Sequence, residues 1–568
     1  SKLRHLHYIS KSTDGSQDDL FVESLLLKDK TLPRGVVNVV SQFGADPSGT
    51  NDSTAALQTA VRYARTDNVT LYLPIGCYRV TDTINVIESR NGRYQPTVIV
   101  GERSSSSSRS STSDDINSDD DHQFEGLPHK ATLFLPPSTP SFDNPKTAKT
   151  LVFFQTDWCL AVGAEDGQLA DGCTPGQHSR LSPWQFNQVL QDVDIVLASG
   201  NPSAVGVTQR GAQGTSLQDV TVFADPASVA GVAGGNGGGG SFISVTVVGA
   251  RIGLDMRVAD IPTLVGITLV NQTCAGVVFG GGKGTSMTMG ATGLTITGQP
   301  RLAGLLAGVN LESFEDAECN PMVVMPNFPP IGNETVQSTS SSTTVELVVD
   351  VDGPYVSQGP PDGPEVQALQ SAATVTDSSF DLRGGPATHC VISNSSLMLS
   401  NNFFAGCKAP VKTAGGQTPV NVSTTQPFVH VQQLAFGRPT FPPSPERKFA
   451  FSFPWYHNGQ RMTSPGLLKM GTPVQAPPGD LASKHVWDAN RGDDLTWQTP
   501  EAVNALDHGV LGDGVTDDYA ALQAVIDAHD LVYLPKGFYR ISQPLVVGHR
   551  KTSQLSYHGL VGVGRTLS

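Results

Sequence analysis

The chain has 568 residues, a formal net charge of −15 at pH 7 and a sequence pI near 5.3. This acidity argues against a nucleic-acid or anionic-lipid surface, each of which needs clustered basic residues, so a neutral, hydroxyl-rich partner fits better. Only 16% of the residues are charged, whereas Gly (59) and Pro (39) are abundant, which predicts short strands and turns rather than long helices. No apolar run reaches the roughly 20 residues that a membrane span requires.

The first recognisable pattern follows an N-terminal extension assigned to residues 1–35. Between Phe43 and Val80 the sequence combines a Gly/Asp turn, a short amphipathic helix and an alternating strand. Asp52 stands where a helix N-cap is wanted, because a short carboxylate can accept hydrogen bonds from the free amides of the first turn. This order predicts a cap that closes one end of a larger body.

Short β-like phrases fill the tract after this cap, such as LQDVTVF and VGITLVNQTCAGVVF, and they recur at roughly 20 to 25 residues. That period is typical of a parallel β-helix, in which each coil buries its apolar face only against neighbouring coils. Greek-key sandwiches also use short strands, but the cap in front favours the β-helix. We therefore predict an all-β protein with a right-handed parallel β-helix over residues 36–407, interrupted by an acidic, Ser-rich insertion at residues 104–121.

The C-terminal part repeats the first cap. Residues 408–502 are rich in Pro and are predicted to link two β-helices, and Gly509 to Gln523 then aligns without a gap with Gly44 to Gln58. Residues 503–568 are therefore predicted to be the cap and first coil of a second β-helix, with Asp517 in the capping position. Because one coil cannot bury its own apolar face, we expect this truncated copy to pack against the remainder of a second β-helix, from the same protein or a cleaved fragment.

The duplicated phrase, with its Asp, Ala-Leu-Gln and Leu-Pro-x-Gly-x-Tyr elements, resembles the N-terminal cap of the pectate-lyase-like β-helix superfamily. Two copies several hundred residues apart look like glycoside hydrolase family 55, the β-1,3-glucanases, which contain two side-by-side β-helices. The stretch from Ala204 to Phe223 and the glycine run from Gly234 to Phe242 are similar to a coil and a loop of that family. The resemblance implies inverting hydrolysis of β-1,3-glucan by a Glu general acid on the second β-helix, without a cofactor. No residue of this sequence is assigned as that acid.

The resemblance also supplies two candidate substrate-binding residues, Gln213 and Arg210. Gln213 matches the Gln of an Ala-Gln-x-Thr-Ser phrase in the family, whereas Gln209 and Arg210 stand where the family has an aromatic residue followed by Gln. In the next coil ADIPT, from Ala259 to Thr263, replaces an expected Gln-Gln-aromatic-Thr phrase. These departures favour a non-catalytic alternative.

Sequons and cysteines indicate a secreted glycoprotein, extracellular or in a cell wall. The seven cysteines show no zinc-type spacing, so disulfides are predicted rather than a metal site, with Cys159–Cys173 and Cys390–Cys407 as plausible local pairs. Six acceptor sequons predict glycosylation at Asn51, Asn68, Asn271, Asn333, Asn394 and Asn421.

Two functional hypotheses remain open from the sequence. In the first, the chain is the N-terminal part of a β-1,3-glucan hydrolase, and its partner is that glucan or another neutral polysaccharide. In the second, it is a non-catalytic structural or carbohydrate-binding extracellular building block that uses the paired β-helix as a rigid scaffold. Neither hypothesis involves nucleic acid, a metal or a nucleotide cofactor.

Overall fold

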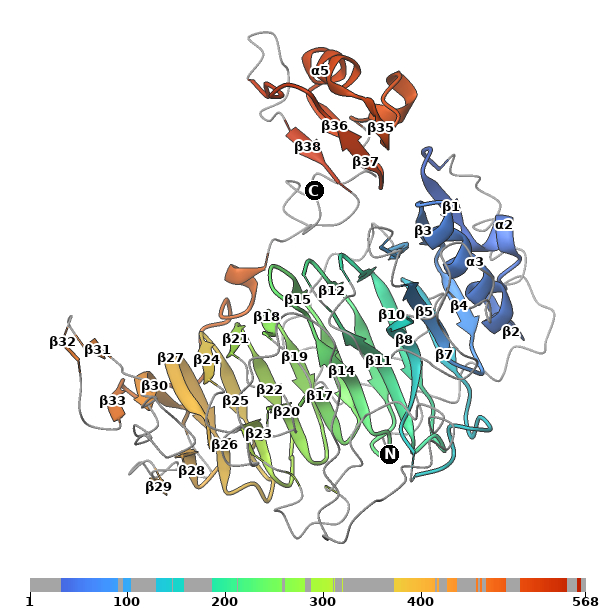
Figure 1. Cartoon of the computed structure of the whole chain (residues 1–568). Coiled ribbons are helices and arrows are strands. Elements are labelled where there is room, and N and C mark those ends of the chain that lie inside the picture. The colour runs from blue at the N-terminus through green and yellow to red at the C-terminus, as the bar shows by residue number, and fades with distance from the viewer. Residues whose placement is uncertain are drawn as a thin grey trace, which may run out of the picture.

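A computed structural model shows a long stack of parallel strands with a second, smaller unit beside one end (Figure 1). No helix in the described part of the chain is both long enough and apolar enough to cross a bilayer. The residues that the structure describes are 32–89, 96–103, 129–145, 147–157, 186–211, 213–257, 261–280, 288–309, 311, 319, 372–413, 416–417, 427–436, 456–457, 460–461, 466–486, 501–548 and 559–562.

The main body is a right-handed parallel β-helix with three faces, as the strand phrases predicted. Each coil runs through one strand of each face before it returns to the first face.

The first face contains β1 (Val36–Asn38), β3 (Thr70–Leu73), β6 (Val98–Gly101), β9 (Val189–Gln191), β12 (Ser216–Gln218), β15 (Ser241–Ile243), β18 (Thr263–Val265), β21 (Thr288–Thr292), β24 (Ala372–Thr376) and the start of β27 (Ser396–Ala405). The second face contains β2 (Ser48–Asp52), β4 (Gly76–Arg79), β7 (Ala131–Leu135), β10 (Val193–Leu197), β13 (Thr221–Ala224), β16 (Thr246–Gly249), β19 (Thr268–Val270), β22 (Thr295–Thr297), β25 (Ser379–Asp381) and the end of β27. The third face contains β5 (Ile84–Ser89), β8 (Lys149–Asp157), β11 (Ala204–Arg210), β14 (Ala230–Gly235), β17 (Ile252–Met256), β20 (Ala275–Phe279), β23 (Ala303–Ala307), β26 (His389–Ser393), β28 (Ala409–Thr413) and β29 (Gly416–Gln417).

From the coil of β9 and β10 to the coil of β24 and β25, a sharp corner joins the first face to the second, and its residue adopts the left-handed backbone conformation. The corner amide donates a hydrogen bond to a carbonyl of the next coil, from Asp192 to Gln218 at 3.0 Å and from Asp219 to Ile243 at 3.0 Å. We call this series the corner ladder. Its members, with φ between 47° and 67°, are Asp192, Asp219, Ser244, Gly266, Gly293 and Asp377. Asp and Gly tolerate this conformation better than branched residues do, which explains their frequency at the corner.

The apolar core is a set of stacks that run along the inside of the coils. On the first face the inward stack includes Leu190, Leu217, Phe242 and Leu264, each within 1% of complete burial. Neighbouring outward residues are mostly polar or small, such as Ser216 and Ser241. The two-residue alternation of strands therefore separates a continuous core from the outer faces.

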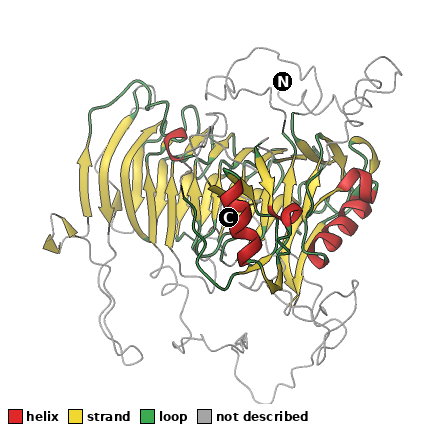
Figure 2. Cartoon of the chain, turned by 90° about the horizontal axis from the view of Figure 1, so that it is seen from above, coloured by secondary structure: helices red, strands yellow, loops and turns green. Residues whose placement is uncertain are grey.

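Two helices close the N-terminal end of the core, α2 (Val39–Phe43) and α3 (Thr54–Thr66), and they lie at one end of the strand stack in Figure 2. The expected capping roles shift by one residue. Ser53 and Asp518 occupy the N-cap positions of α3 and α5 (Tyr519–Ala528), whereas Asp52 and Asp517 precede them and accept from the amides of Thr54 and Tyr519. Each carboxylate still satisfies a free first-turn amide.

The C-terminal end of the stack changes to antiparallel pairing. β30 (Val429–Phe436) pairs antiparallel with β27, and β33 (Gly466–Met470) pairs antiparallel with β30. Between β30 and β33 in the sequence lies a small hairpin of β31 (Tyr456–His457) and β32 (Gln460–Arg461). A 3-10 turn, η3 (Ser483–His485), follows β33.

The second unit repeats the start of the first. It contains β34 (Ala502–Asn504), η5 (Ala505–His508), β35 (Asp513–Asp517), α5, β36 (Leu531–Tyr533), β37 (Phe538–Arg540) and β38 (Gly559–Val561). β34, β36 and β38 pair in parallel, as β1, β3 and β6 do in the first unit. The domain boundaries at 35, 407 and 502 themselves remain predictions.

Replacing Leu264 with Ala should lower the free energy of unfolding by about 2 to 5 kcal/mol, because the truncation leaves a cavity in the inner stack. Its neighbour Thr263 is exposed and gives the control, Thr263→Ala, for which a change below about 0.5 kcal/mol is expected. Urea unfolding followed by far-ultraviolet circular dichroism measures both. Equal losses for the two variants would contradict the assignment of inward and outward residues.

Candidate carbohydrate-binding face

Turns rich in glycine join the third face to the first and form one side of the candidate site. The turn after β11 stacks on the turn after β14, because the amide of Gly214 donates to the carbonyl of Gly238 at 3.2 Å. A Cβ on Gly240 would lie 2.1 Å from the carbonyl oxygen of Thr215, so only glycine allows this approach. The surface here is therefore made largely of backbone, which a flat ligand can approach closely.

Asn236 holds the glycine-rich turn in place from below. Its side chain is fully buried, and Nδ2 donates to the carbonyls of Gly237 and Gly240, both at 2.9 Å. Its Oδ1 accepts from the amide of Thr263 in the next coil at 2.9 Å. One side chain thus fixes two successive turns. Asn236 was not predicted from the sequence, although a lone Asn within a glycine run is a signal for such a role.

Gln213, the principal candidate from the sequence, lies exposed at the tip of the first of these turns. Its carbonyl accepts from the amide of Asn187 at 2.9 Å, which fixes the backbone and leaves the amide side chain at the surface. Exposed Ile261 lies near the same row of turns, 3.2 Å from where a Cβ of Gly238 would be. Arg210 ends β11, opposite Gly235, and its side chain lies outside what the structure describes.

Polar side chains continue from these turns onto the outside of the first face. Gln218 donates to Ser216 Oγ at 3.0 Å, and Ser216 Oγ donates to the carbonyl of Ser241 at 2.7 Å. Gln191 lies opposite Gln218 on the preceding coil and donates to Asp192 Oδ2 at 2.9 Å. Gln191 Oε1 is buried and has no hydrogen-bond partner in the described structure. Gln191, Ser216, Gln218 and Ser241 are all buried, so these contacts order the outside of the first face and leave the exposed turns as the accessible part of the site.

Two carboxylates border this face at successive positions of the corner ladder. Asp192 and Asp219 are almost fully buried, and Arg103 pairs with Asp192 at 3.1 Å. Lys130 pairs with Asp194 at 3.2 Å and donates to the carbonyl of Asp219. Burial and the charge of Asp219 raise the pKa of Asp192, and Arg103 only partly opposes them. A carboxyl with a raised pKa retains its proton more readily and can act as an acid.

The second unit packs against the first face immediately before this polar stretch. Tyr533 on β36 is buried against Val98, Val100 and Val189 of β6 and β9, together with Ala502 and Val561. Lys536 donates to the carbonyls of Ala64 and Val69, and Arg34 donates to the carbonyl of Leu506 at 2.7 Å. The two caps therefore lie side by side.

The order of these contacts also gives the direction of the second unit. β34 and η5 meet Arg34 at the level of β1, whereas β38 joins the cluster at β6 and β9. The second unit consequently advances along the same direction as the first β-helix.

The cysteines and sequons fall in several environments. Cys390 and Cys407, which the sequence paired, form a disulfide with a Cα–Cα distance of 5.5 Å, and Cys274 joins Cys319, a pair that the sequence did not suggest. Cys159 and Cys173 lie outside the described residues, as do Asn333 and Asn421. Asn51 and Asn271 are exposed, whereas Asn68 and Asn394 are half-buried. Within the described ranges no group of three or more His, Cys, Asp or Glu could hold a metal ion.

Residues 36–129 and 502–568 match the family model of rhamnogalacturonase A/epimerase, pectate lyase-like proteins, so the matched segments contain both caps. Mannuronan C5-epimerase AlgE1 of Azotobacter vinelandii is 52% identical over 48 residues, which are 8% of this chain and 3% of that protein. AlgE5 of the same organism is 57% identical over 44 residues, 7% of this chain and 4% of that protein. The chain thus spans only 3 to 4% of the length of these curated relatives.

Solved structures with similar folds include the Agl-KA catalytic domain, with a TM-score of 0.33 and 13% identity over 67% of this chain and 56% of that one. The tailspike protein of E. coli bacteriophage HK620 in complex with a pentasaccharide has a TM-score of 0.31 and 11% identity, over 74% of this chain and 69% of that one. PfbA, a surface adhesin of Streptococcus pneumoniae, has a TM-score of 0.26 and 11% identity, over 70% of this chain and 98% of that one. Similarity at this level says nothing about activity. The pectate-lyase-like β-helix assignment is supported by the family model at both caps and agrees with the strand topology.

The raised pKa of Asp192 predicts a pH-dependent effect of Asp192→Asn. An unfolded Asp titrates near pH 3.9, so the folded state binds this proton more tightly. The stability that this proton contributes is present below about pH 4 and is lost as the pH rises through the folded pKa. The wild-type protein should therefore lose stability relative to Asp192→Asn as the pH rises above about 4, as measured by urea unfolding. A difference that stays constant or moves the other way would contradict the raised pKa.

Proposed function

We propose that this chain belongs to a secreted, polysaccharide-acting β-helix protein, and that it binds a neutral glucan, β-1,3-glucan first of all, along the candidate face. The observation that carries the proposal is the row of glycine turns and polar side chains beside the point where the second cap packs. Gln213 and Ile261 are exposed along this row, whereas Gln218 and Ser241 are buried, so one extended chain of sugars could contact the turns of successive coils.

Charge supports a neutral polysaccharide over the polyuronates that the names of the similar proteins suggest. Rhamnogalacturonan and mannuronan carry carboxylates, and the protein has a formal net charge of −15. Two of the cations near the face, Arg103 and Lys130, are paired with Asp192 and Asp194. No free positive charge among these described residues is available to hold a polyanion, and like charges repel.

Hydrolysis is the proposed reaction where the whole protein supplies both acid and water-positioning groups. An inverting glycosidase separates them by roughly 6.5 to 9.5 Å, which a cleft between two β-helices can provide. Assignment to glycoside hydrolase family 55 belongs to this proposal. In it, Gln213 holds the sugar from the first β-helix, and Arg210 is placed on the same strand-to-turn segment.

A rigid, non-catalytic scaffold is the second candidate, and the turn after β17 favours it. Exposed Ile261 and Thr263 occupy the coil where the resemblance expects Gln and aromatic residues. The full-length protein should be incubated with laminarin, rhamnogalacturonan and mannuronan between about pH 4 and pH 8, with reducing-sugar release and binding both measured. Binding and cleavage of laminarin support the hydrolase, and binding alone supports a carbohydrate-binding scaffold. Absence of both from laminarin overturns the glucan proposal.

Replacing Gln213 with Ala should weaken laminarin binding about 2- to 10-fold, because one amide-to-hydroxyl hydrogen bond contributes about 0.5 to 1.5 kcal/mol. The melting temperature should not change, because the side chain is exposed. Gln433→Ala on β30 is the matched control, since Gln433 is also exposed but lies on the antiparallel end of the stack. Isothermal titration calorimetry measures both. Equal affinities of Gln213→Ala and wild-type protein would remove Gln213 from the binding face.

A further inference from the structure

The segment Leu481–Val486, which includes η3, lies across three successive positions of the corner ladder. We call it the strap. Leu481 is buried against Phe403, Phe428 and Val474 near the end of the β-helix. From this anchor the strap crosses the corners at Gly293 and Gly266.

These two corners have room for the strap because they are glycines. A Cβ on Gly293 would lie 2.8 Å from the Cα of Ala482, and a Cβ on Gly266 would lie 2.2 Å from Cγ2 of Val486. Both distances are far below ordinary contact. Elsewhere the ladder has Asp or Ser, at positions 192, 219 and 244. The missing side chains thus form a slot that this segment fills.

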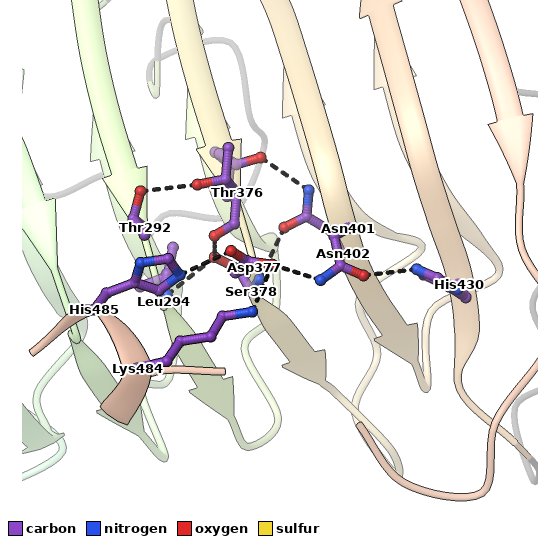
Figure 3. Close-up of polar contacts among 11 residues, drawn as sticks. Thr292, Leu294, Thr376, Asp377, Ser378, Asn401, Asn402, His430, Lys484 and His485 are labelled. Atoms are coloured by element: carbon purple, nitrogen blue, oxygen red, sulfur yellow. Dashed lines mark hydrogen bonds and ion pairs between the residues drawn. The ribbon is translucent and has the colours of Figure 1, made fainter. Parts of the chain in front are cut away.

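Asp377, the next corner residue, binds the strap by charge. Its carboxylate accepts from His485 Nε2 at 2.7 Å and pairs with Lys484 Nζ at 3.1 Å, as Figure 3 shows. The side chain of Asn401 donates to the same carboxylate at 2.5 Å. Three donors from the strap and the β-helix therefore converge on one carboxylate.

A further contact fixes Asn401 in the orientation that this carboxylate requires. His430 Nε2 lies 2.8 Å from Asn401 Oδ1, and the His430 ring stacks on Phe403 with 4.4 Å between centroids. Because Asn401 uses its nitrogen toward Asp377, its oxygen faces His430, which must be the donor. The hydrogen bonds from His430 to Asn401 and from Asn401 to Asp377 involve no residue of the strap, and they orient the carboxylate that the strap binds.

We propose that the corner slot and Asp377 form a clamp for the strap, and that this clamp holds the second cap beside the first. The chain leaves the β-helix at its C-terminal end, whereas the second cap packs at its N-terminal end. The strap is the described segment between them that contacts the corners on the way back. Fixing it shortens the free connection and raises the effective concentration of the second cap at β6 and β9.

The charges around Asp377 determine how acid acts on the clamp. The titratable groups that face it are Lys484 and His485 on the strap and, through Asn401, His430 on β30. Burial alone would raise the pKa of Asp377, but the hydrogen bonds from Asn401, Lys484 and His485 outweigh it and lower the pKa. Burial lowers the pKa of His430, which keeps that ring neutral. The clamp is therefore complete above about pH 4 and opens as the pH falls through the folded pKa of Asp377.

Hydrogen–deuterium exchange on the full chain tests the clamp with two variants and a matched control. Asp377→Asn removes the charge, and the double variant Lys484→Ala/His485→Ala removes its partners without touching the β-helix. The control is Asp381→Asn, which breaks the Asp381–Arg383 pair on the same coil but lies outside the strap contacts. Exchange is read in peptides that cover the strap amides and β36, with peptides of β12 to β18 as a folding reference.

Both clamp variants should speed exchange of the strap at pH 7 by about tenfold or more and also speed exchange in β36, whereas Asp381→Asn should change neither. The reference strands should exchange as in the wild-type protein, and the wild-type strap should lose its protection only below about pH 4. Unchanged strap exchange in the double variant overturns the clamp. Faster strap exchange without a change in β36 overturns its role in holding the second cap.

Discussion

The corner ladder is the constraint on which the rest of the structure depends. From β9 onward, each coil turns sharply from the first face to the second through a corner residue in the left-handed conformation, and the amide exposed there must find a partner. The next coil supplies that partner, as in the bonds from Asp192 to Gln218 and from Asp377 to Ser400. Each corner therefore fixes the position of the following coil. The inner stacks and the flat outer faces follow from this regular repeat.

The side chain at each corner then determines what lies outside the β-helix. Asp192 and Asp219 place carboxyl groups at the border of the polar face, where Arg103 pairs with Asp192 and Lys130 donates to the carbonyl of Asp219. Gly266 and Gly293 leave a slot that accepts another segment of the chain. Asp377 adds a carboxylate at the end of that slot. One backbone position, repeated in successive coils, thus borders the proposed binding face and forms the proposed clamp for the strap.

Position along the axis links these features to the proposed binding of a glucan. The second cap covers the outward valines Val98, Val100 and Val189 of β6 and β9, and the polar outward residues begin with Gln191 at the end of β9 and continue on β12. Apolar residues therefore lie where the two units touch, and hydrogen-bonding groups lie where the contact ends. Rigid turns matter for such a face, because a sugar polymer gains little from side chains that must first be ordered. Asn236 provides this rigidity without reaching the surface.

Local patterns in the sequence were sufficient for the β-helix and for both caps. Strand alternation, the spacing of the coils and the repeated Asp–Ala-Leu-Gln phrase are all properties of neighbouring residues, and the disulfide between Cys390 and Cys407 closes a short segment. The exact N-caps, Ser53 and Asp518, differed by one residue because the preceding carboxylates satisfy the amides from outside the helix.

Contacts between distant residues were decided only by the tertiary structure. Asn236 acts on Thr263 of the next coil, Cys274 joins Cys319 across 45 residues, and Asp377 meets His485 more than a hundred residues away. None of these partners can be read from spacing, because insertions between coils change the sequence separation without changing the stacking. The sequence by itself determined that the chain forms β-helical coils and that it contains two caps. The corner geometry decided which side chains meet outside those coils, since the register of stacked coils exists only in the folded chain.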